Sequence, residues 1–162
     1  LESDKRYPDE ALELSYRRYS NERVFIPSNL YVIGTMNVAD RSLALVDMAL
    51  RRRFAFIDLE PIFNKSWRNW LINRSGIPEN IVQIIEHRMI ELNQMISNDA
   101  ALGQQFKIGH SYVTPPLEST IDNAKEWYIQ VVETEIKPLL DEYWFDSPDK
   151  ARSAKDRLIF GL

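Results

Sequence analysis

The sequence predicts an α/β region followed by an all-α region. Two short apolar runs, residues 30–33 and 54–59, have the length of buried β-strands. After Pro61 the pattern changes, because apolar residues recur every three or four positions, as they do on one face of an α-helix. We therefore divide the chain into a strand-bearing part, residues 1–62, and a helical part, residues 63–162.

The first apolar run, Leu30 to Ile33, predicts a strand that is buried on both faces of a parallel sheet. Asn37 follows just past the carboxyl end of this strand. Open α/β sheets bind ligands at this edge, and a carboxamide offers a bound group both a donor and an acceptor. Asn37 is therefore a candidate ligand contact, and the alternative is that its side chain only caps a turn.

A short helical segment is predicted between the two strands, with Ser42 and Asp47 as candidate amino-terminal caps. It ends in three successive cations, Arg51, Arg52 and Arg53. Cations are favourable at the negative end of a helix, but three adjacent ones repel each other. The run is either a solvated helix end or a set of contacts to phosphate, and the second strand follows it directly, beginning at Phe54.

Residues 11–27 predict a β-hairpin. Leu12, Leu14 and Tyr16 alternate with polar residues, and Ser20 and Asn21 stand at the bend. Two interpretations stay open for this ribbon. It is either a sheet edge protected by its arginines or a ribbon that faces a pore or a neighbouring molecule.

The helical part contains several predicted helices. Ser66 is a candidate cap for the first. Apolar residues at helical spacing predict a second helix of about five turns with one core-facing stripe: Ile81, Ile85, Met89, Leu92 and Ile96. Residues 127–144 predict a further helix with a bend at Pro138, and residues 158–160 are expected to dock on the helices.

A polar cluster lies in the loop-rich segment 103–116. Its members are Lys107, Gly109, His110, Ser111 and Tyr112. The cluster is either a functional loop or a surface turn with Tyr112 packed against the helices. The second histidine, His87, lies among polar residues of a predicted helix and is expected to be a solvated surface residue, so no metal site is predicted.

Composition excludes several classes of protein. The formal net charge is -4 and the chain has no cysteine, which argues against a free-standing basic nucleic-acid binder, a disulfide framework and a thiolate metal site. No apolar run is long enough to span a bilayer, and no secretory signal is recognisable. We expect a cytoplasmic protein whose contacts with DNA, if it makes any, come from parts outside this chain.

The chain has no phosphate-binding loop. None of its five glycines lies in a GxxxxGK[ST] pattern. Acidic pairs occur at Asp9 with Glu10 and at Asp141 with Glu142, but neither follows an apolar strand in the way that Mg²⁺-positioning acids do. We therefore expect the chain alone to bind no nucleotide or cofactor.

Two motifs then resemble a known family. MNVADRS, starting at Met36, and ALRRRF, starting at Ala49, are similar to MNTADRS and ALRRRF of the McrB family of AAA+ GTPases, with Val38 as the departure. FKIGHSYV, starting at Phe106, and EIKPLLDEYWFD, starting at Glu135, extend the resemblance over nearly the whole chain. It implies a carboxyl-terminal fragment of an AAA+ protein.

The resemblance implies a role for each part of the chain. Residues 1–62 would be the sensor half of the AAA+ α/β domain, with the ribbon at 11–27 as a pre-sensor β-hairpin. Residues 63–162 would be a small helical lid domain. Asn37 would be the sensor residue, and Arg52 and Arg53 would be catalytic contacts across a subunit boundary. Six further residues would contact nucleotide or a neighbouring subunit: Asp40, Arg41, Arg51, His110, Ser111 and Tyr112.

The resemblance also implies an activity and partners. The full-length protein would hydrolyse GTP or ATP with Mg²⁺ and form a homo-oligomeric ring, a hexamer. With a McrC-like nuclease subunit it would restrict DNA that contains 5-methylcytosine. Two alternatives stay open: a MoxR-like ATPase that remodels proteins, and a non-catalytic interaction module.

Overall fold

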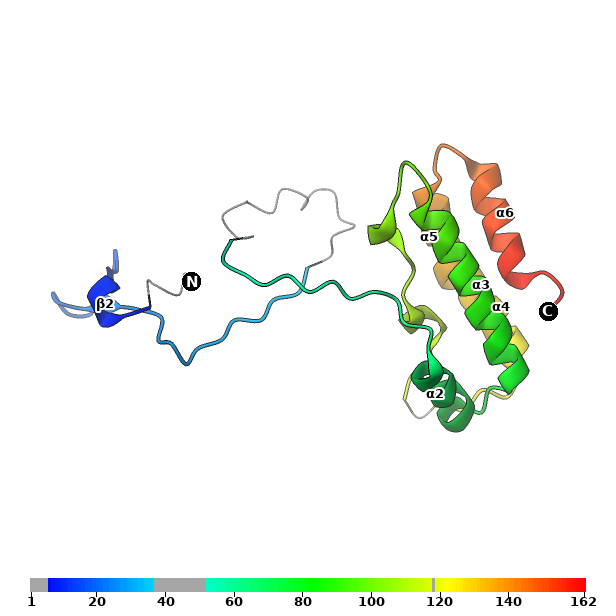
Figure 1. Ribbon diagram of the computed structural model, residues 1–162, viewed down its shortest axis with the longest axis horizontal. Helices are drawn as coiled ribbons and strands as arrows, with labels where there is room; N and C mark the ends of the chain where they lie inside the picture. Colours follow the sequence, from blue (N-terminus) through cyan, green and yellow to red (C-terminus); the bar gives the residue numbers. More distant parts are fainter. Residues whose placement is uncertain (1–5, 37–51, 118) are drawn as a thin grey trace. The chain divides into compact units, whose positions relative to one another are not determined.

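The computed structural model describes residues 6–36, 52–117 and 119–162 (Figure 1). The chain divides into two compact units, Leu1–Asp58 and Leu59–Leu162. Asn37, Asp40, Arg41 and Arg51 of the predicted site lie outside the described residues.

Helices dominate the described secondary structure, and most of them lie in the second unit (Figure 1). The elements are η2 (Pro8–Glu10), β1 (Leu12–Glu13), β2 (Arg23–Val24), α2 (Lys65–Ser75), α3 (Glu79–Ser97), η4 (Gln104–Phe106), η5 (His110–Val113), α4 (Ala124–Val131), the π-helical segment η6 (Val132–Ile136), α5 (Lys137–Tyr143) and α6 (Pro148–Ile159).

A small antiparallel ladder forms within the predicted hairpin. β1 pairs with β2 through Leu12 opposite Val24 and Glu13 opposite Arg23. The backbone N–H of Glu22 donates to the carbonyl of Tyr19, which places the bend where the sequence predicts it. The ladder has two residue pairs, so it is much shorter than the predicted ribbon at 11–27, and the role of a pre-sensor hairpin stays a prediction.

The two apolar runs of the first unit differ from the predicted buried strands. Neither Leu30 to Ile33 nor residues 54–59 form a strand. Except for the partly buried Phe54, their large side chains are exposed, with Ile33 94% and Leu59 91% accessible. A strand satisfies its backbone N–H and C=O groups only by pairing with neighbouring strands. In the described part of the chain, the ladder consists of β1 and β2 alone, so these runs have no strand to pair with.

The helices predicted for the second part are present. α2 begins one residue after Asn64, whose Oδ1 accepts from the backbone N–H of Trp67. Asn64 is therefore the cap in place of the predicted Ser66, because its extended backbone leaves the side chain free to reach back to the first turn. Gly76 ends α2 with a φ of 71°, a left-handed conformation that favours glycine.

The apolar stripe of α3 forms the centre of the core, as predicted. Its five residues, from Ile81 to Ile96, are each at most 3% exposed. Val132, Ile136 and Leu140 of the α4–η6–α5 segment are also buried, and this segment packs against α3 through α4 and against α6 through η6 and α5. This segment runs as one helix and widens to π geometry just before Pro138, where the backbone lacks an N–H donor.

α6 completes the bundle, although the sequence predicts only docking of residues 158–160. It buries Ala151, Ala154 and Leu158 against its neighbours. Leu158 is 1% exposed, which confirms docking at that position, whereas Phe160 is 82% exposed.

Asp99 ties the end of α3 to α5 and α6. Its carboxylate accepts from the Trp144 indole (2.8 Å), the Ala101 backbone N–H (2.8 Å) and the Lys150 ammonium group. The Lys150 hydrogen bond, followed by those from Trp144 and Ala101, lowers the pKa of Asp99 from 3.8 to about 2. The charged form of this carboxylate therefore stabilises the packed arrangement of three helices.

Candidate functional site

The described part of the first predicted cluster consists of Arg52 and Arg53. Both lie in a turn and are exposed. An exposed guanidinium can reach a carboxylate or a phosphate of another molecule, with up to five donors in a planar fork. The exposure agrees with both interpretations of the arginine run, so the catalytic assignment stays a prediction.

The second predicted cluster has a defined geometry in the helical unit. Lys107 follows the turn η4, and η5 begins at His110 and carries Ser111 and Tyr112. Ser111 and Tyr112 are exposed, while Lys107 and His110 are partly buried. The cluster is thus a short ordered segment in which two residues point to solvent and two pack inside the unit.

A buried asparagine fixes this segment to α3. Asn93 is 7% exposed and makes two hydrogen bonds with the backbone of Ile108. Its Oδ1 accepts from the Ile108 N–H at 2.7 Å, and its Nδ2 donates to the Ile108 carbonyl at 2.9 Å. Because Ile108 stands between Lys107 and His110, Asn93 sets the position of the whole cluster.

Lys107 and His110 hold the segment by which the chain enters the helical unit. The Lys107 ammonium group donates to Oε2 of Glu60 at 2.8 Å. The backbone N–H of Ile62 donates to Nδ1 of His110 at 3.2 Å. An imidazole nitrogen accepts only when it carries no proton, so the ring proton of a neutral His110 is on Nε2.

Aromatic packing and a threonine complete the same arrangement. The Phe63 ring meets Trp67 and His110 edge-on, with centroid distances of 5.1 and 6.3 Å. Thr114 accepts from the Trp67 indole at 2.9 Å and donates to the His110 carbonyl at 2.6 Å. We call this set of residues the linker clasp: Glu60, Ile62, Phe63 and Trp67 on one side and Lys107, His110 and Thr114 on the other.

The linker clasp changes how the second cluster is understood. The sequence singles out Lys107 and His110 but gives no indication of Glu60, Ile62 or Asn93 as their partners. Contacts of Ser111 and Tyr112 with nucleotide or a neighbouring subunit stay predictions, as does such a contact for His110.

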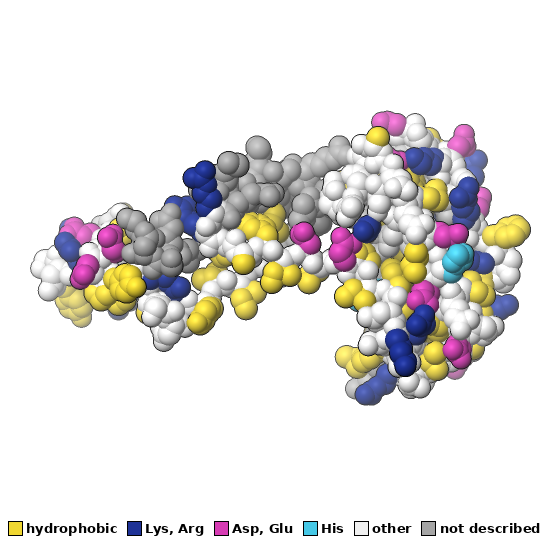
Figure 2. Space-filling view, in the orientation of Figure 1, with side chains coloured by type: hydrophobic (Ala, Val, Ile, Leu, Met, Phe, Trp, Pro, Cys, Tyr) yellow, Lys and Arg dark blue, Asp and Glu magenta, His cyan; other side chains and the backbone are white. Residues whose placement is uncertain are grey.

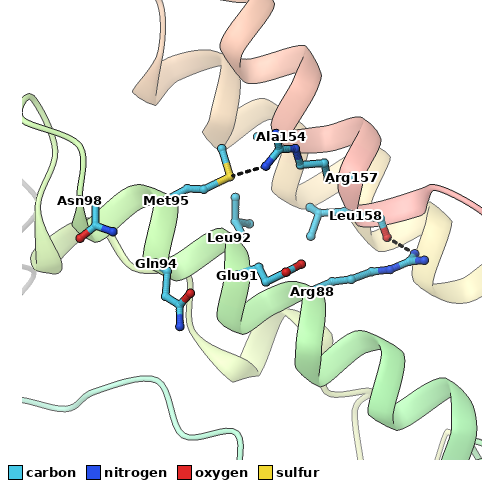
Figure 3. A pocket seen from close by; sticks show the side chains of 9 residues that line it. All are labelled: Arg88, Glu91, Leu92, Gln94, Met95, Asn98, Ala154, Arg157 and Leu158. Carbon is cyan, nitrogen blue, oxygen red and sulfur yellow. Dashed lines mark hydrogen bonds between the residues drawn. The ribbon is translucent and has the colours of Figure 1, made fainter.

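A groove lies between α3 and α6 in the helical unit (Figure 3). Its volume is about 270 Å³, just below the usual range of small-molecule sites, roughly 300–1,000 Å³. Arg88 extends across it and donates to the carbonyls of Leu158 and Phe160 at the end of α6. The Arg88 guanidinium therefore caps the carboxyl end of α6 and ties it to α3.

The described residues show neither a metal site nor a membrane-spanning helix. No group of three or more histidine, aspartate or glutamate side chains in residues 6–36, 52–117 and 119–162 is arranged to hold a metal ion. Over the same ranges, no helix has the length and apolar character needed to cross a bilayer.

Comparison with known proteins agrees with the helical architecture. Residues 84–152 match the family model described as McrB, alpha-helical lid domain. Over 161 residues, 98% of its length, the chain is 45% identical to the Type IV methyl-directed restriction enzyme EcoKMcrB subunit of Escherichia coli (strain K12). The chain spans 35% of the length of that relative. The chain is therefore McrB-like, and residues 84–152 of its helical unit are similar to the alpha-helical lid domain of McrB.

Proposed function

We propose that this chain is part of an AAA+ nucleotide hydrolase subunit, a GTPase, that drives modification-dependent DNA restriction. The observation that carries the proposal is the 45% identity, over 98% of the chain, to a methyl-directed restriction enzyme subunit. The match of residues 84–152 to the alpha-helical lid domain of McrB supports it. The hydrolytic activity concerns a longer protein, since this chain spans 35% of the relative's length.

The proposed catalytic residues of this chain are Asn37, Arg52 and Arg53. In phosphoryl transfer a protein positions the attacking water and neutralises charge that develops on the phosphate. A carboxamide such as Asn37 can orient the water with its donor and acceptor. Arg52 and Arg53 are exposed, as an arginine must be to reach the nucleotide of a neighbouring subunit.

The remaining contacts would come from Asp40, Arg41 and Arg51 near this site, and from Ser111 and Tyr112 of the lid. Mg²⁺ and the nucleotide phosphates would be held by parts outside this sequence, because it contains no phosphate-binding loop. When bound, the metal ion supplies neutralising charge to the phosphates.

The proposed assembly is a homo-oligomeric ring, a hexamer, that acts with a McrC-like nuclease subunit on DNA containing 5-methylcytosine. An arginine that reaches across a subunit boundary requires that the subunits associate. Because the chain carries a net charge of -4, DNA would be bound by other parts of the protein.

The proposal also accounts for the exposed apolar runs of the first unit. In the longer protein, residues 30–33 and 54–59 would add to an AAA+ sheet as buried strands. Pairing would satisfy their backbone groups and remove side chains such as Tyr31, 83% exposed, and Ile57, 82% exposed, from water.

The test is made in the longer protein that contains this chain, by measuring GTP hydrolysis of Arg52→Ala and Arg53→Ala. Loss of an arginine that reaches a phosphoryl-transfer site lowers the rate by about 10³ to 10⁵, whereas loss of a solvated charge changes stability by at most about 1 kcal/mol. Arg152→Ala, whose side chain is 71% exposed on α6, is the matched control.

Mixing distinguishes action between subunits from action within one. An arginine variant with an intact phosphate-binding loop should regain turnover when it is mixed with subunits that keep the arginine but have a defective phosphate-binding loop. Normal hydrolysis by both arginine variants would exclude the catalytic assignment, and a preference for ATP without DNA restriction would favour the MoxR-like alternative. A longer protein that hydrolyses no nucleotide would favour an interaction module.

A further inference from the structure

We propose that His110 is a positioning residue of the hydrolytic cycle. Through Nδ1 it fixes the direction in which the linker, Leu59 to Phe63, leaves the helical unit, and so couples the lid to the arginine run that precedes the linker. The inference rests on the proposed function, and it goes beyond it by assigning a linker-holding role to a residue otherwise expected to contact nucleotide.

The clasp can hold the linker rigidly because the segment that carries His110 is itself fixed to neighbouring helices. Asn93 is buried and binds both backbone groups of Ile108, two residues before His110. Thr114 binds the His110 carbonyl and, through its other hydrogen bond, the indole of Trp67 in α2. His110 is thus anchored from α3 and α2 at once, and movement of these helices carries its ring along.

The hydrogen bond to Ile62 gives His110 a specific role in holding the linker. The Ile62 N–H is in the linker backbone, so Nδ1 restrains the chain itself rather than a flexible side chain. Glu60 and Phe63 add an ion pair and a ring contact on either side of Ile62. Three of the four linker residues from Glu60 to Phe63 therefore contact Lys107 or His110.

The linker joins the clasp to the proposed catalytic arginines. Glu60 is seven residues after Arg53 in the sequence, a distance that an extended chain spans in at most about 25 Å. A clasped linker transmits a lid displacement toward Arg52 and Arg53, whereas a released linker absorbs it by rotation of its own backbone. His110 then affects turnover more than nucleotide binding.

Two substitutions at His110 separate the hydrogen bond from packing. His110→Phe keeps a ring beside Phe63 but removes the acceptor. His110→Asn places an amide oxygen at the position of Nδ1 and can still accept from Ile62. His87→Phe is the matched control, because His87 is a histidine on α3 whose side chain is 75% exposed.

The first measurement uses the 162-residue chain and needs no hydrolysis. Nitrogen NMR of the His110 ring should show the proton on Nε2. Exchange of the Ile62 amide with solvent should be about tenfold faster in His110→Phe than in the native chain or in His110→Asn, for loss of a hydrogen bond of about 1.4 kcal/mol. Equal Ile62 exchange in all three proteins would overturn the clasp.

The second measurement is hydrolysis in the longer protein. We expect His110→Phe to lower kcat by about tenfold to a hundredfold, with KM within about twofold, and His110→Asn to restore most of kcat. Parallel loss of kcat in both variants, a rise in KM alone, or a loss that follows melting temperature would overturn the positioning role. If the native longer protein does not hydrolyse nucleotide, the proposed function and the coupling both fail, while the NMR result still decides the clasp.

Discussion

Apolar residues are buried in the helical unit of the chain, whereas many of those in the first unit are exposed. In the helical unit Ile85, Met89 and Ile96 are completely buried, whereas in the first unit Ile33 is 94% and Tyr31 83% exposed. Figure 2 shows apolar side chains uncovered along the described residues of the first unit. Both units are rich in apolar residues, so hydrophobicity alone does not account for the difference.

The difference lies in how each kind of element satisfies its backbone. A helix pairs its N–H and C=O groups within the same segment, so a few amphipathic helices can build a core by themselves. A strand needs neighbours on its edges before its side chains can be buried. The described first unit offers a ladder of two residue pairs, too little to shelter the other apolar runs.

The largest expected effect is the difference in stability between two isoleucine-to-alanine substitutions, one in each unit. Ile85→Ala removes a fully buried side chain and should lower the free energy of unfolding of the helical unit by about 2–5 kcal/mol. Ile33→Ala should change stability by less than about 0.5 kcal/mol, because its side chain is in water. Urea unfolding followed by circular dichroism measures both, and an equal cost at the two positions would contradict the comparison.

The next effect concerns the polar anchor of the helical unit. Asn93→Ala leaves the buried N–H and C=O of Ile108 without their partner and should destabilise the unit by about 3 kcal/mol. Gln94→Ala, the exposed neighbour on α3, is the control. If the two variants unfold at the same urea concentration, the segment 107–114 is held by apolar packing alone.

Acid should weaken the helical unit through Asp99. The folded-state pKa of about 2 lies below the ordinary value of 3.8, so the charged carboxylate contributes stability that is complete above about pH 4 and is lost as the pH falls toward 2. Asp99→Asn should cost about 1–3 kcal/mol at pH 7 and should flatten the fall between pH 4 and pH 2.

Melting temperature measured across this pH range tests the assignment. Asp149→Asn is the control, because the Asp149 side chain is 98% exposed. If the melting temperature of Asp99→Asn falls with pH as it does in the native chain, another carboxylate governs acid unfolding.

The smallest effect should be a gain in stability. The Tyr128 side chain is completely buried, and no residue in the described part of the chain makes a hydrogen bond with its hydroxyl, whose pKa burial raises. Tyr128→Phe should therefore stabilise the unit by about 1 kcal/mol. Tyr112→Phe, with an exposed hydroxyl-bearing side chain, should have no effect, and a destabilised Tyr128→Phe would reveal a partner for the hydroxyl.

Local patterns in the sequence were enough for the elements that depend on near neighbours. The stripe from Ile81 to Ile96 predicts α3 and its buried face, and the bend between Tyr19 and Glu22 is where its residues predict it. α6 was missed because its buried face consists mainly of Ala151 and Ala154, small residues that give a weak periodic signal. The cap of α2 was misplaced by two residues, since Asn64 and Ser66 both have suitable side chains.

The sequence by itself determined that a helical region follows Pro61 and that the chain is McrB-like, because helical periodicity and contiguous motifs are local properties. Only the tertiary structure decided the linker clasp, whose hydrogen bonds join residues 47 or 48 positions apart, as from Ile62 to His110. It also decided that the apolar runs of the first unit stay exposed. Pairing partners at long range depend on how the whole chain packs, and no spacing of residue types along the sequence specifies them.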